Sequence, residues 1–508
     1  MYRNLASVGG LTLLSRGTGF VRDVVVGAVL GAGASADAFF VAFRLPNHFR
    51  AIFGEGAFNA AYVPSYARVL ETEGPGEAKR FSSQIFTLLL ASQIVFLALA
   101  WIFMPTLVRL LAPGFDADPP KFELAVRLTR ITFPYLLFVT LVTLHSGTLN
   151  AHRKFTAAAF APVLLNLAMV AFLGLAFLFP GAAEAASYGV TVSGALQLGL
   201  MMWAARRQGV LEKLTWPRST RDVRRFFAAL GPAVIGSAGV QIALFADTII
   251  ASMLPTGAVS SIYYADRIYQ LPVGVIGIAA GTVLLPEMSR CLAAGDRQAA
   301  FQAQNRTMAL TIALTTPFCV AFLCIPVMIM RGVFVHGAFT DAAAQSAGMV
   351  LGAYGLGLFA VVLIRSAVAS FQARGDTTTP MVAALVAVAF NVALKIALYR
   401  TLGTVGLAGA TAAGAWINLA ILVVLAVRRG DMRPDRRLID LLIAVFLAAD
   451  ALAAIAVFGA GPLQRLAMPF GSFRATSELL VLGVIGMTGY LVALLIGLRV
   501  LGIKLARR

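Results

Sequence analysis

The chain has 508 residues, of which 59% are hydrophobic and 13% charged, and its mean hydropathy is +0.84. A soluble core cannot bury that much apolar surface, so lipid must act as the solvent for most of it. In a membrane protein the formal net charge of +18 mainly sets orientation and attracts anionic lipid, which argues against a nucleic-acid partner. Composition therefore predicts a polytopic, all-α membrane protein.

Apolar segments of membrane-spanning length recur along the whole chain. We expect fourteen transmembrane helices, at residues 5–30, 34–68, 80–111, 122–150, 155–179, 185–206, 223–253, 258–291, 299–331, 342–373, 379–401, 405–428, 437–459 and 474–502. An even number of crossings places both termini on one side. The basic connections 206–225 and 428–437 contrast with the acidic connection 114–118, and the positive-inside rule then predicts cytoplasmic termini.

An internal repeat divides the chain. The run NAHRKFT at 150–156 corresponds to QARGDTT at 372–378, and VPSYAR at 63–68 corresponds to LPEMSR at 285–290. Six crossings restore the starting side, so the two copies are parallel and are expected to surround a central cavity. We predict an N-lobe at 1–210, a C-lobe at 211–430, and two additional C-terminal helices at 431–508.

Charged residues occur inside several predicted membrane helices. A charge facing lipid at the bilayer centre costs roughly 2.5–3.5 kcal/mol, so these side chains should face protein or a water-filled cavity. They can bind a ligand, or they can form buried pairs that hold the lobes together. The set comprises Arg16, Arg22, Asp23, Asp37, Arg44, Arg50, Glu55, Asp266 and Arg267.

The prevalence of arginine in this set indicates an anionic ligand. The guanidinium stays charged in any pocket and grips phosphate through two hydrogen bonds. Pro46 should bend the second helix between Arg44 and Arg50, a break that membrane proteins tolerate where it lines a cavity. Neither a P-loop nor a hydrolase motif occurs. These observations predict a transporter without a cofactor, driven by the membrane potential or an ion gradient.

A second polar group lies in the predicted C-lobe. Asp247, Asn391, Lys395 and Thr411 fall in the predicted helices 7, 11 and 12. If those helices pack together, Asp247 can neutralise Lys395, or the group can exchange a proton or cation with the membrane gradient. The four histidines lack the spacing of a metal site, and no metal is expected.

Five runs of residues resemble the MurJ (MviN) family of lipid II flippases. They are SRGTGFVRD at 15–23, DAFFVAFRLPN at 37–47, EGAF at 55–58, APGF at 112–115 and YYADR at 263–267. The likeness extends from residue 1 to about 505. It implies the fold of the multidrug/oligosaccharidyl-lipid/polysaccharide exporter superfamily, with two six-helix lobes, and a groove for the lipid tail formed by the two C-terminal helices.

The resemblance also implies a substrate. The family moves the undecaprenyl-pyrophosphate-linked disaccharide-pentapeptide, lipid II, from the inner to the outer leaflet of the bacterial cytoplasmic membrane by alternating access, as cell wall synthesis requires. Its cavity arginines match Arg16, Arg22, Arg50 and Arg267, with acidic partners at Asp23 and Asp37, while Arg44 and Glu55 complete the candidate substrate site. Lys395 stands where some relatives carry an acid of a cation site, so its ammonium can replace a bound sodium ion.

Two other classes of function are kept as alternatives. The chain can be a flippase for another undecaprenyl-linked glycan, or an ion-coupled exporter of the same superfamily. It can also be a membrane enzyme or scaffold that acts on phosphorylated lipids. Drug exporters bind cations, which a cavity lined by arginine disfavours, and an enzyme needs a catalytic cluster that the sequence does not reveal. The expected partners are lipid II, membrane lipid and other cell-wall synthesis proteins.

Overall fold

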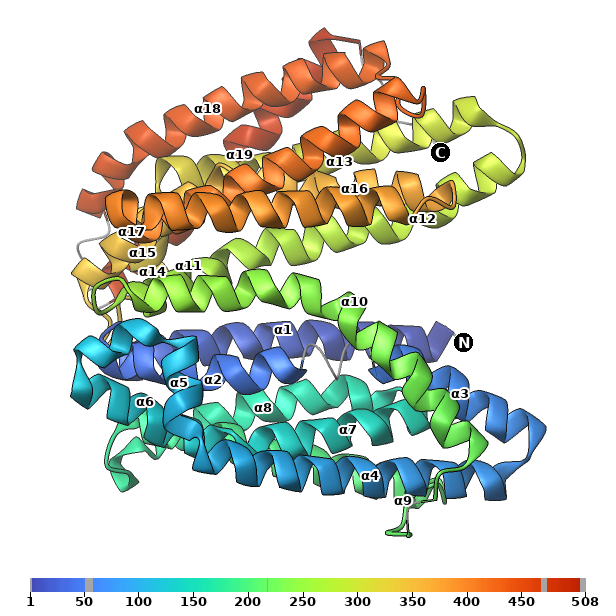
Figure 1. Cartoon of the computed structure of the whole chain (residues 1–508). Coiled ribbons are helices and arrows are strands. Elements are labelled where there is room, and N and C mark those ends of the chain that lie inside the picture. Colours follow the sequence, from blue (N-terminus) through green and yellow to red (C-terminus); the bar gives the residue numbers. More distant parts are fainter. Residues whose placement is uncertain (1, 51–57, 217, 467–472, 503–508) are drawn as a thin grey trace. The chain divides into compact units, whose positions relative to one another are not determined.

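The computed structural model describes residues 2–50, 58–216, 218–466 and 473–502, and every regular element among them is helical (Figure 1). Side chains are described for these residues except 2–8, 49–50, 235–244, 278, 460 and 462–466. The chain divides into two compact units, Met1–Ser260 and Ser261–Arg508. The predicted lobes, with their boundary after residue 210, rest on the sequence repeat and stay a prediction.

Unit 1 contains ten α-helices and two short 3-10 helices among its described residues. They are α1 (Tyr2–Leu30), α2 (Ala34–Arg50), α3 (Phe58–Thr72), α4 (Pro75–Ile102), α5 (Met104–Leu111), η2 (Pro113–Ala117), α6 (Pro119–Thr132), α7 (Pro134–Ala151), α8 (Thr156–Gly174), η3 (Ala176–Leu178), α9 (Ala182–Arg207) and α10 (Arg221–Ser252).

Unit 2 begins within α11 (Ala258–Pro272), whose first three residues belong to unit 1. A π-helical segment, η4 (Val273–Gly277), continues α11. The remaining helices are α12 (Ile278–Ala293), α13 (Arg297–Cys324), α14 (Pro326–Phe334), α15 (Asp341–Gly355), α16 (Leu358–Ala373), α17 (Thr378–Arg428), α18 (Arg436–Leu466) and α19 (Arg474–Val500).

The helix bounds reproduce the internal repeat. The bounds of α4 reappear 222 residues later in α13 at both ends, and α8 and α17 begin with the same shift. The second repeat departs from the first at Gly403, where φ is 56° and ψ is −135° within α17. The first part of α17 thus corresponds to α8 and the second to α9. The predicted all-α fold is confirmed, whereas the number of six helices per repeat stays a prediction.

Prolines break three of the predicted segments. One is 299–331, which is α13 and α14, with Pro326 in the first turn of α14. The segment 80–111 is two helices, α4 and α5, and the segment 122–150 is also two, α6 and α7. Pro105 and Pro134 stand in the first turns of α5 and α7. Proline lacks the N–H that would continue the preceding helix, but it fits the first turn of a new one.

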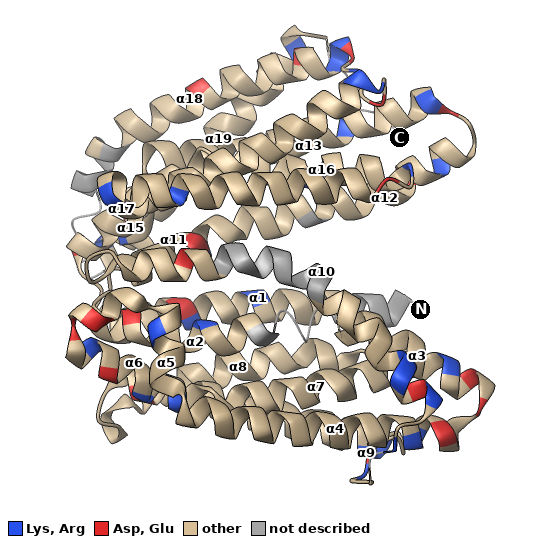
Figure 2. Ribbon diagram, in the orientation of Figure 1, with Lys and Arg blue, Asp and Glu red and all other residues tan. Residues whose placement is uncertain are grey.

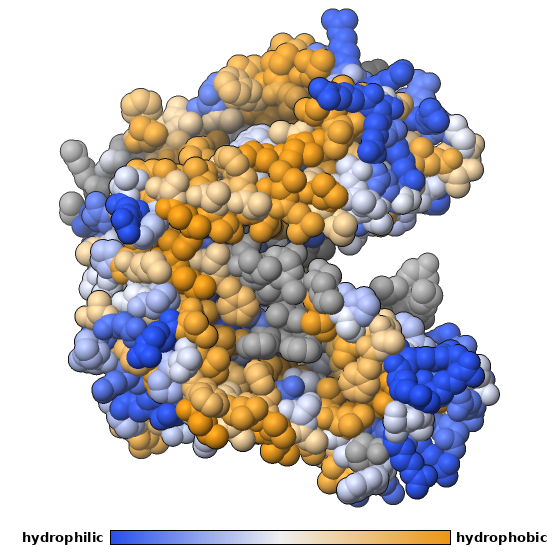
Figure 3. Space-filling view, viewed as in Figure 1, coloured by the Kyte–Doolittle hydropathy of each residue, from blue (hydrophilic) through white to orange (hydrophobic). Residues whose placement is uncertain are grey.

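Eight helical stretches among the described residues are long and apolar enough to cross a membrane, with α6–α7 and α11–α12 each counted as one stretch. A ninth span results if α15 and α16, bent by 41°, count as one, and α17 counts once although Gly403 divides it. The number of fourteen spans stays a prediction. Charged residues gather at helix ends, and a few lie along the helices, among them residues of α1, α2, α11, α17 and α18 (Figure 2). Apolar side chains cover the lengths of the visible helices (Figure 3).

The core of unit 1 is aromatic, and that of unit 2 is built around its last helices. Phe58, Tyr62 and Tyr66 of α3 pack with Phe81 of α4 and Phe226 of α10. In unit 2, α18 and α19 lie side by side, α18 packs on α13, and α19 packs on α14 (Figure 1). The two helices outside the repeat are thereby an integral part of unit 2.

Candidate functional site

Arg22 and Asp23 form a buried ion pair on α1. The Arg22 Nη2 and Nε atoms lie 2.6 and 3.0 Å from Asp23 Oδ1, and only 7% and 4% of the two residues are exposed. Arg22 Nη1 donates to Asn166 Oδ1 of α8 at 3.0 Å. The Asn166 amide in turn donates to the Ser15 carbonyl and to Thr18 Oγ1, both at 3.0 Å. The guanidinium is therefore held in one orientation by two helices.

Two other arginines of the predicted set have described side chains in unit 1. Arg44 of α2 is half-buried and donates from Nη1 to Thr248 Oγ1 of α10 at 2.8 Å. Arg16 is exposed on α1 and forms no ion pair with a described residue. Both guanidinium groups thus carry a charge that no carboxylate of the described chain neutralises. The Arg50 side chain and all of Glu55 lie outside the described residues.

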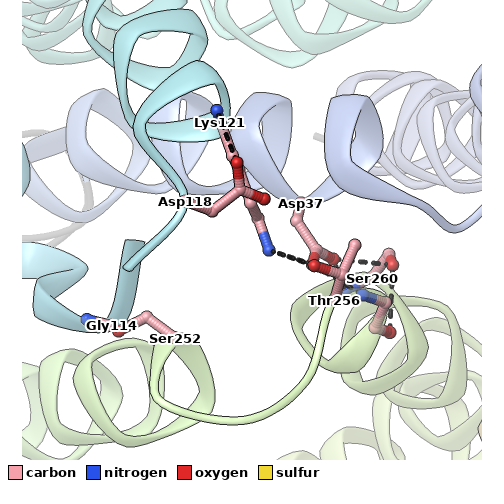
Figure 4. Close-up of polar contacts among 8 residues, drawn as sticks. Asp37, Gly114, Asp118, Lys121, Ser252, Thr256 and Ser260 are labelled. Carbon is pink, nitrogen blue, oxygen red and sulfur yellow. Dashed lines mark hydrogen bonds and ion pairs between the residues drawn. The ribbon is translucent and has the colours of Figure 1, made fainter. Parts of the chain in front are cut away.

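Asp37 lies at the other end of α2 in a closed polar cluster (Figure 4). Its carboxylate is fully buried and 2.9 Å from Lys121 Nζ of α6. It accepts hydrogen bonds from the Gly257 and Ser260 amides and from Ser260 Oγ, each at 2.8 Å. Thr256 Oγ1 completes the surroundings of Lys121 at 3.4 Å. Asp37 thereby caps the first turn of α11, and its predicted role in substrate binding stays a prediction.

The connection before α6 packs around the same cluster. Lys121 Nζ lies 4.2 Å from the Phe115 ring centre, and Asp118 Oδ1 accepts from the Lys121 amide as the N-cap of α6. The Gly114 amide donates to Ser252 Oγ of α10 at 3.2 Å. A Cβ on Gly114 would come within 2.1 Å of the Ser252 carbonyl oxygen, so only glycine fits there. Lys121 was not among the residues predicted from the sequence. It could have been noticed as the lone basic residue of the otherwise acidic segment 112–121.

Arg267 and Asp266 lie on α11 within unit 2. The Arg267 guanidinium carbon lies 4.5 Å from the Tyr263 ring centre, a cation–π contact one turn back on the same helix. Gln270 Nε2 donates to Asp266 Oδ1 at 3.3 Å. The contacts that hold both charged side chains come partly from their own helix.

The candidate ion-coupling residues are distributed over α10 and α17. Asp247 is half-buried on α10 in unit 1, whereas Lys395 on α17 in unit 2 is only 1% exposed. A Cβ on Gly414 would lie 2.9 Å from the Asn391 Cβ, so the two parts of α17 pack closely there. Thr411 Oγ1 donates to a carbonyl of its own helix. Among the described residues, no group of three His, Cys, Asp or Glu side chains is placed to hold a metal ion.

Arg365 is a charged residue of α16 that sequence reasoning missed. It is exposed and forms no ion pair with a described residue. Glycines allow close packing beside it, since added Cβ atoms on Gly277 and Gly281 would lie 3.5 and 3.8 Å from its side chain. The sequence did indicate Arg365, because it interrupts the apolar run 356–373. Like the other predicted residues, it is a charge inside a predicted membrane helix.

Comparison with known proteins gives the family. The family described as "Lipid II flippase MurJ" matches residues 26–473. The "Probable lipid II flippase MurJ" of Rhizobium meliloti is 41% identical over 459 residues, which cover 89% of this chain and 86% of that protein. The "Lipid II flippase MurJ" of Burkholderia cenocepacia is 33% identical, covering 86% of this chain and 85% of that protein.

Solved structures show the same fold. A structure of "Lipid II flippase MurJ, inward closed conformation" superposes with a TM-score of 0.79 at 23% identity, covering 97% of this chain and 99% of that one. An inward-facing MATE family transporter of the MOP superfamily superposes with a TM-score of 0.68 at 14% identity, covering 82% and 94%. The chain belongs to the lipid II flippase MurJ family.

Proposed function

We propose that this protein is a lipid II flippase. It carries the undecaprenyl-pyrophosphate-linked disaccharide-pentapeptide from the inner to the outer leaflet of the cytoplasmic membrane by alternating access. The activity is transport rather than catalysis. Membership of the MurJ family supports the substrate, and the arginines of α1 and α2 support the chemistry, because a pyrophosphate needs cations wherever water is scarce.

The two kinds of arginine environment suggest two roles. Arg16 and Arg44 have no carboxylate partner among the described residues, so each can give its full charge to a phosphate. Arg22 is held by Asp23 and Asn166. We propose that it presents a fixed edge to the ligand, because a planar guanidinium that is already oriented loses less freedom on binding. Arg50 and Arg267 are also proposed to bind the pyrophosphate.

The driving force is proposed to be the membrane potential or an ion gradient. Moving a negative charge out of a negative interior gains about 2.3 kcal/mol per charge per 100 mV. The nearly complete burial of Lys395 supports the proposal that its ammonium takes the place of a bound cation. No sodium requirement is then expected.

The proposed location is the bacterial inner membrane, with both termini in the cytoplasm. The basic connections 206–225 and 428–437 support this orientation. Other cell-wall synthesis proteins are proposed partners, since they make the substrate on one side of the membrane and use it on the other.

The experiment is replacement of the native gene by single variants in a strain depleted of the wild-type protein. Arg22→Ala and Arg267→Ala, at normal protein level, should abolish the appearance of lipid II on the outer face. Arg331→Gln is the matched control, because Arg331 forms an exposed pair with Asp341 at 2.9 Å. Full activity of both alanine variants would contradict the proposal. Accumulation of a different lipid-linked precursor during depletion would identify a flippase for another glycan.

A further inference from the structure

A cavity of about 780 Å³ occurs in unit 1, and none of the arginines of α1 and α2 lines it. It lies where the end of α4 and the start of α5 meet α6 and the first turns of α9. Trp101, Pro105, Phe122 and Tyr188 form much of its apolar wall. The volume falls within the range of about 300–1,000 Å³ that is typical of sites for small ligands.

One face of α6 carries the charges of this cavity. Glu123, Arg127 and Arg130 all line it, and their spacing of four and then three residues places them along a single helix face. Helical rise separates the first from the last by about 10 Å along the axis. All three residues are exposed, so their charged ends are available to a ligand.

The middle arginine is the one that is paired inside the protein. Arg127 Nη2 donates to Glu184 Oε1 of α9 at 2.5 Å, and 8% of the Glu184 side chain is exposed. Glu123 and Arg130 form no ion pair with a described residue. The four charged groups sum to zero, and the cavity offers one unpaired carboxylate, one unpaired guanidinium and the N–H donors of Arg127 that Glu184 leaves unused. That pattern complements a zwitterion better than a simple anion.

The order of these groups follows the depth of a lipid leaflet. Glu123 is nearest the connection that precedes α6, Arg127 and Arg130 follow, and Ile131 and Pro134 form the apolar lining beyond them. A phospholipid presents ammonium, phosphate and acyl chains in the same order from water inward. Trp101 and Tyr188, 50% and 43% exposed, are residues that favour the membrane interface.

The second repeat shows that the fold itself does not need these charges. At the shift of 222 residues, the positions of Glu123, Arg127, Arg130 and Glu184 are occupied by Gln345, Met349, Gly352 and Gly406. None of the four carries a charge. The ionic face of α6 is therefore a property of the first repeat and not a requirement of the shared architecture.

We propose that this cavity binds the headgroup of a phosphatidylethanolamine-class lipid, with the phosphate on Arg130 and Arg127 and the primary ammonium on Glu123. An anionic lipid such as phosphatidylglycerol would leave Glu123 without a cation. A choline headgroup would leave it without a hydrogen-bond donor. The site needs no lipid II, so it stands independently of the proposed transport activity.

Native mass spectrometry of the full-length purified protein tests this inference. Titration with phosphatidylethanolamine, phosphatidylcholine and phosphatidylglycerol should show tightest retention of the ethanolamine lipid. Glu123→Gln should reduce its preference over phosphatidylglycerol by about tenfold, as expected for the loss of one charged hydrogen bond. Arg130→Gln should weaken all three lipids, and Arg331→Gln should change none of them. Thermal melting of each purified variant serves as the control for folding.

Trp101 provides a test of position. In a variant that keeps Trp101 while Trp203, Trp216 and Trp416 are changed to phenylalanine, lipids with brominated acyl chains should quench the fluorescence, and the ethanolamine lipid should do so most strongly. Equal retention of the three lipids would overturn the proposal. So would wild-type behaviour of both charge variants, or full competition by water-soluble glycerophosphoethanolamine, which would indicate a site for a free headgroup.

Discussion

Lys121 and Asp37 form an ion pair 2.9 Å long in which 5% and 1% of the side chains are exposed. The pair joins α6 to α2, and the same carboxylate caps the first turn of α11 through the Gly257 and Ser260 amides. Asp37 keeps three other donors if Lys121 is lost, whereas Lys121 keeps only a hydroxyl and an aromatic ring if Asp37 is lost. Loss of Asp37 therefore leaves its partner with fewer stabilising contacts than loss of Lys121 does.

Asp37→Asn should destabilise the protein more than Lys121→Met. Removal of one partner of a buried pair costs about 3–5 kcal/mol because it leaves a buried charge without its counter-charge. Three donors still stabilise the Asp37 carboxylate after Lys121→Met, whereas Lys121 keeps one hydroxyl and one ring after Asp37→Asn. Thermal unfolding of the purified protein measures both effects. Asp116→Asn is the control, because its exposed pair with Arg109 should contribute about 0–1 kcal/mol. A larger effect of Lys121→Met would contradict the asymmetry.

Gly114→Ala should destabilise unit 1 by about 1–3 kcal/mol, the usual cost of overpacking. The new Cβ meets the backbone of Ser252 at 2.1 Å, and backbone cannot rotate away as a side chain can. Gly76→Ala in α4 is the matched control, since nothing lies within 4 Å of its Cβ. The Gly114→Ala variant should melt below the wild type, whereas the Gly76→Ala variant should melt at or above the wild-type temperature.

Arg22→Lys should lower lipid II transport by roughly tenfold or more, although the charge is kept, because charged hydrogen bonds contribute about 1.5–3 kcal/mol. Three guanidinium nitrogens contact Asp23 and Asn166, and a single ammonium cannot reproduce that fork. Arg16→Lys should retain more activity, because Arg16 is exposed and has no such partners. Lipid II on the outer face of cells is the measurement. Equal activity of the two variants would show that transport does not require the guanidinium hydrogen bonds of Arg22.

Asp376 should give a pH-dependent contribution at the start of α17. Hydrogen bonds from the Thr379 side chain and amide, with Arg429, lower the pKa of Asp376 from 3.8 to about 2. A depressed carboxyl pKa stabilises the fold above the ordinary value, and this contribution is lost as the pH falls toward 2. The melting-temperature difference between wild type and Asp376→Asn should stay constant from neutral pH to about pH 5 and narrow below that. A difference that widens in acid would contradict the assignment.

The helices could be predicted because apolar length is a local property of the sequence. The repeat could be predicted because short runs of residues match at a constant shift. Apolar length gave the segments, and matching runs such as 150–156 and 372–378 gave the shift that α4 and α13 reproduce. The breaks at Pro105 and Pro134 were also local signals, but continuous hydrophobicity hid them. Resemblance to the family supplied the substrate.

The partners of the charged residues could not be predicted. Asp37 contacts Ser260, which is 223 positions away, and no periodicity connects them. Asn166 has a polar side chain in an apolar segment, yet nothing in the sequence indicates that it holds Arg22. Such contacts depend on which helix faces pack together, and the hydrophobic pattern of a membrane helix specifies faces weakly, because lipid and protein interior are both apolar.

Gly403 has a practical consequence for protein engineering. The first repeat separates α8 from α9 by the connection 175–181, whereas the second makes the same reversal at one glycine with φ of 56° and ψ of −135°. That backbone conformation is essentially closed to other residues. An epitope tag or a fluorescent reporter should therefore be accepted between residues 176 and 181 and rejected at 403. Matched places in a duplicated architecture can differ completely in their tolerance of inserted sequence.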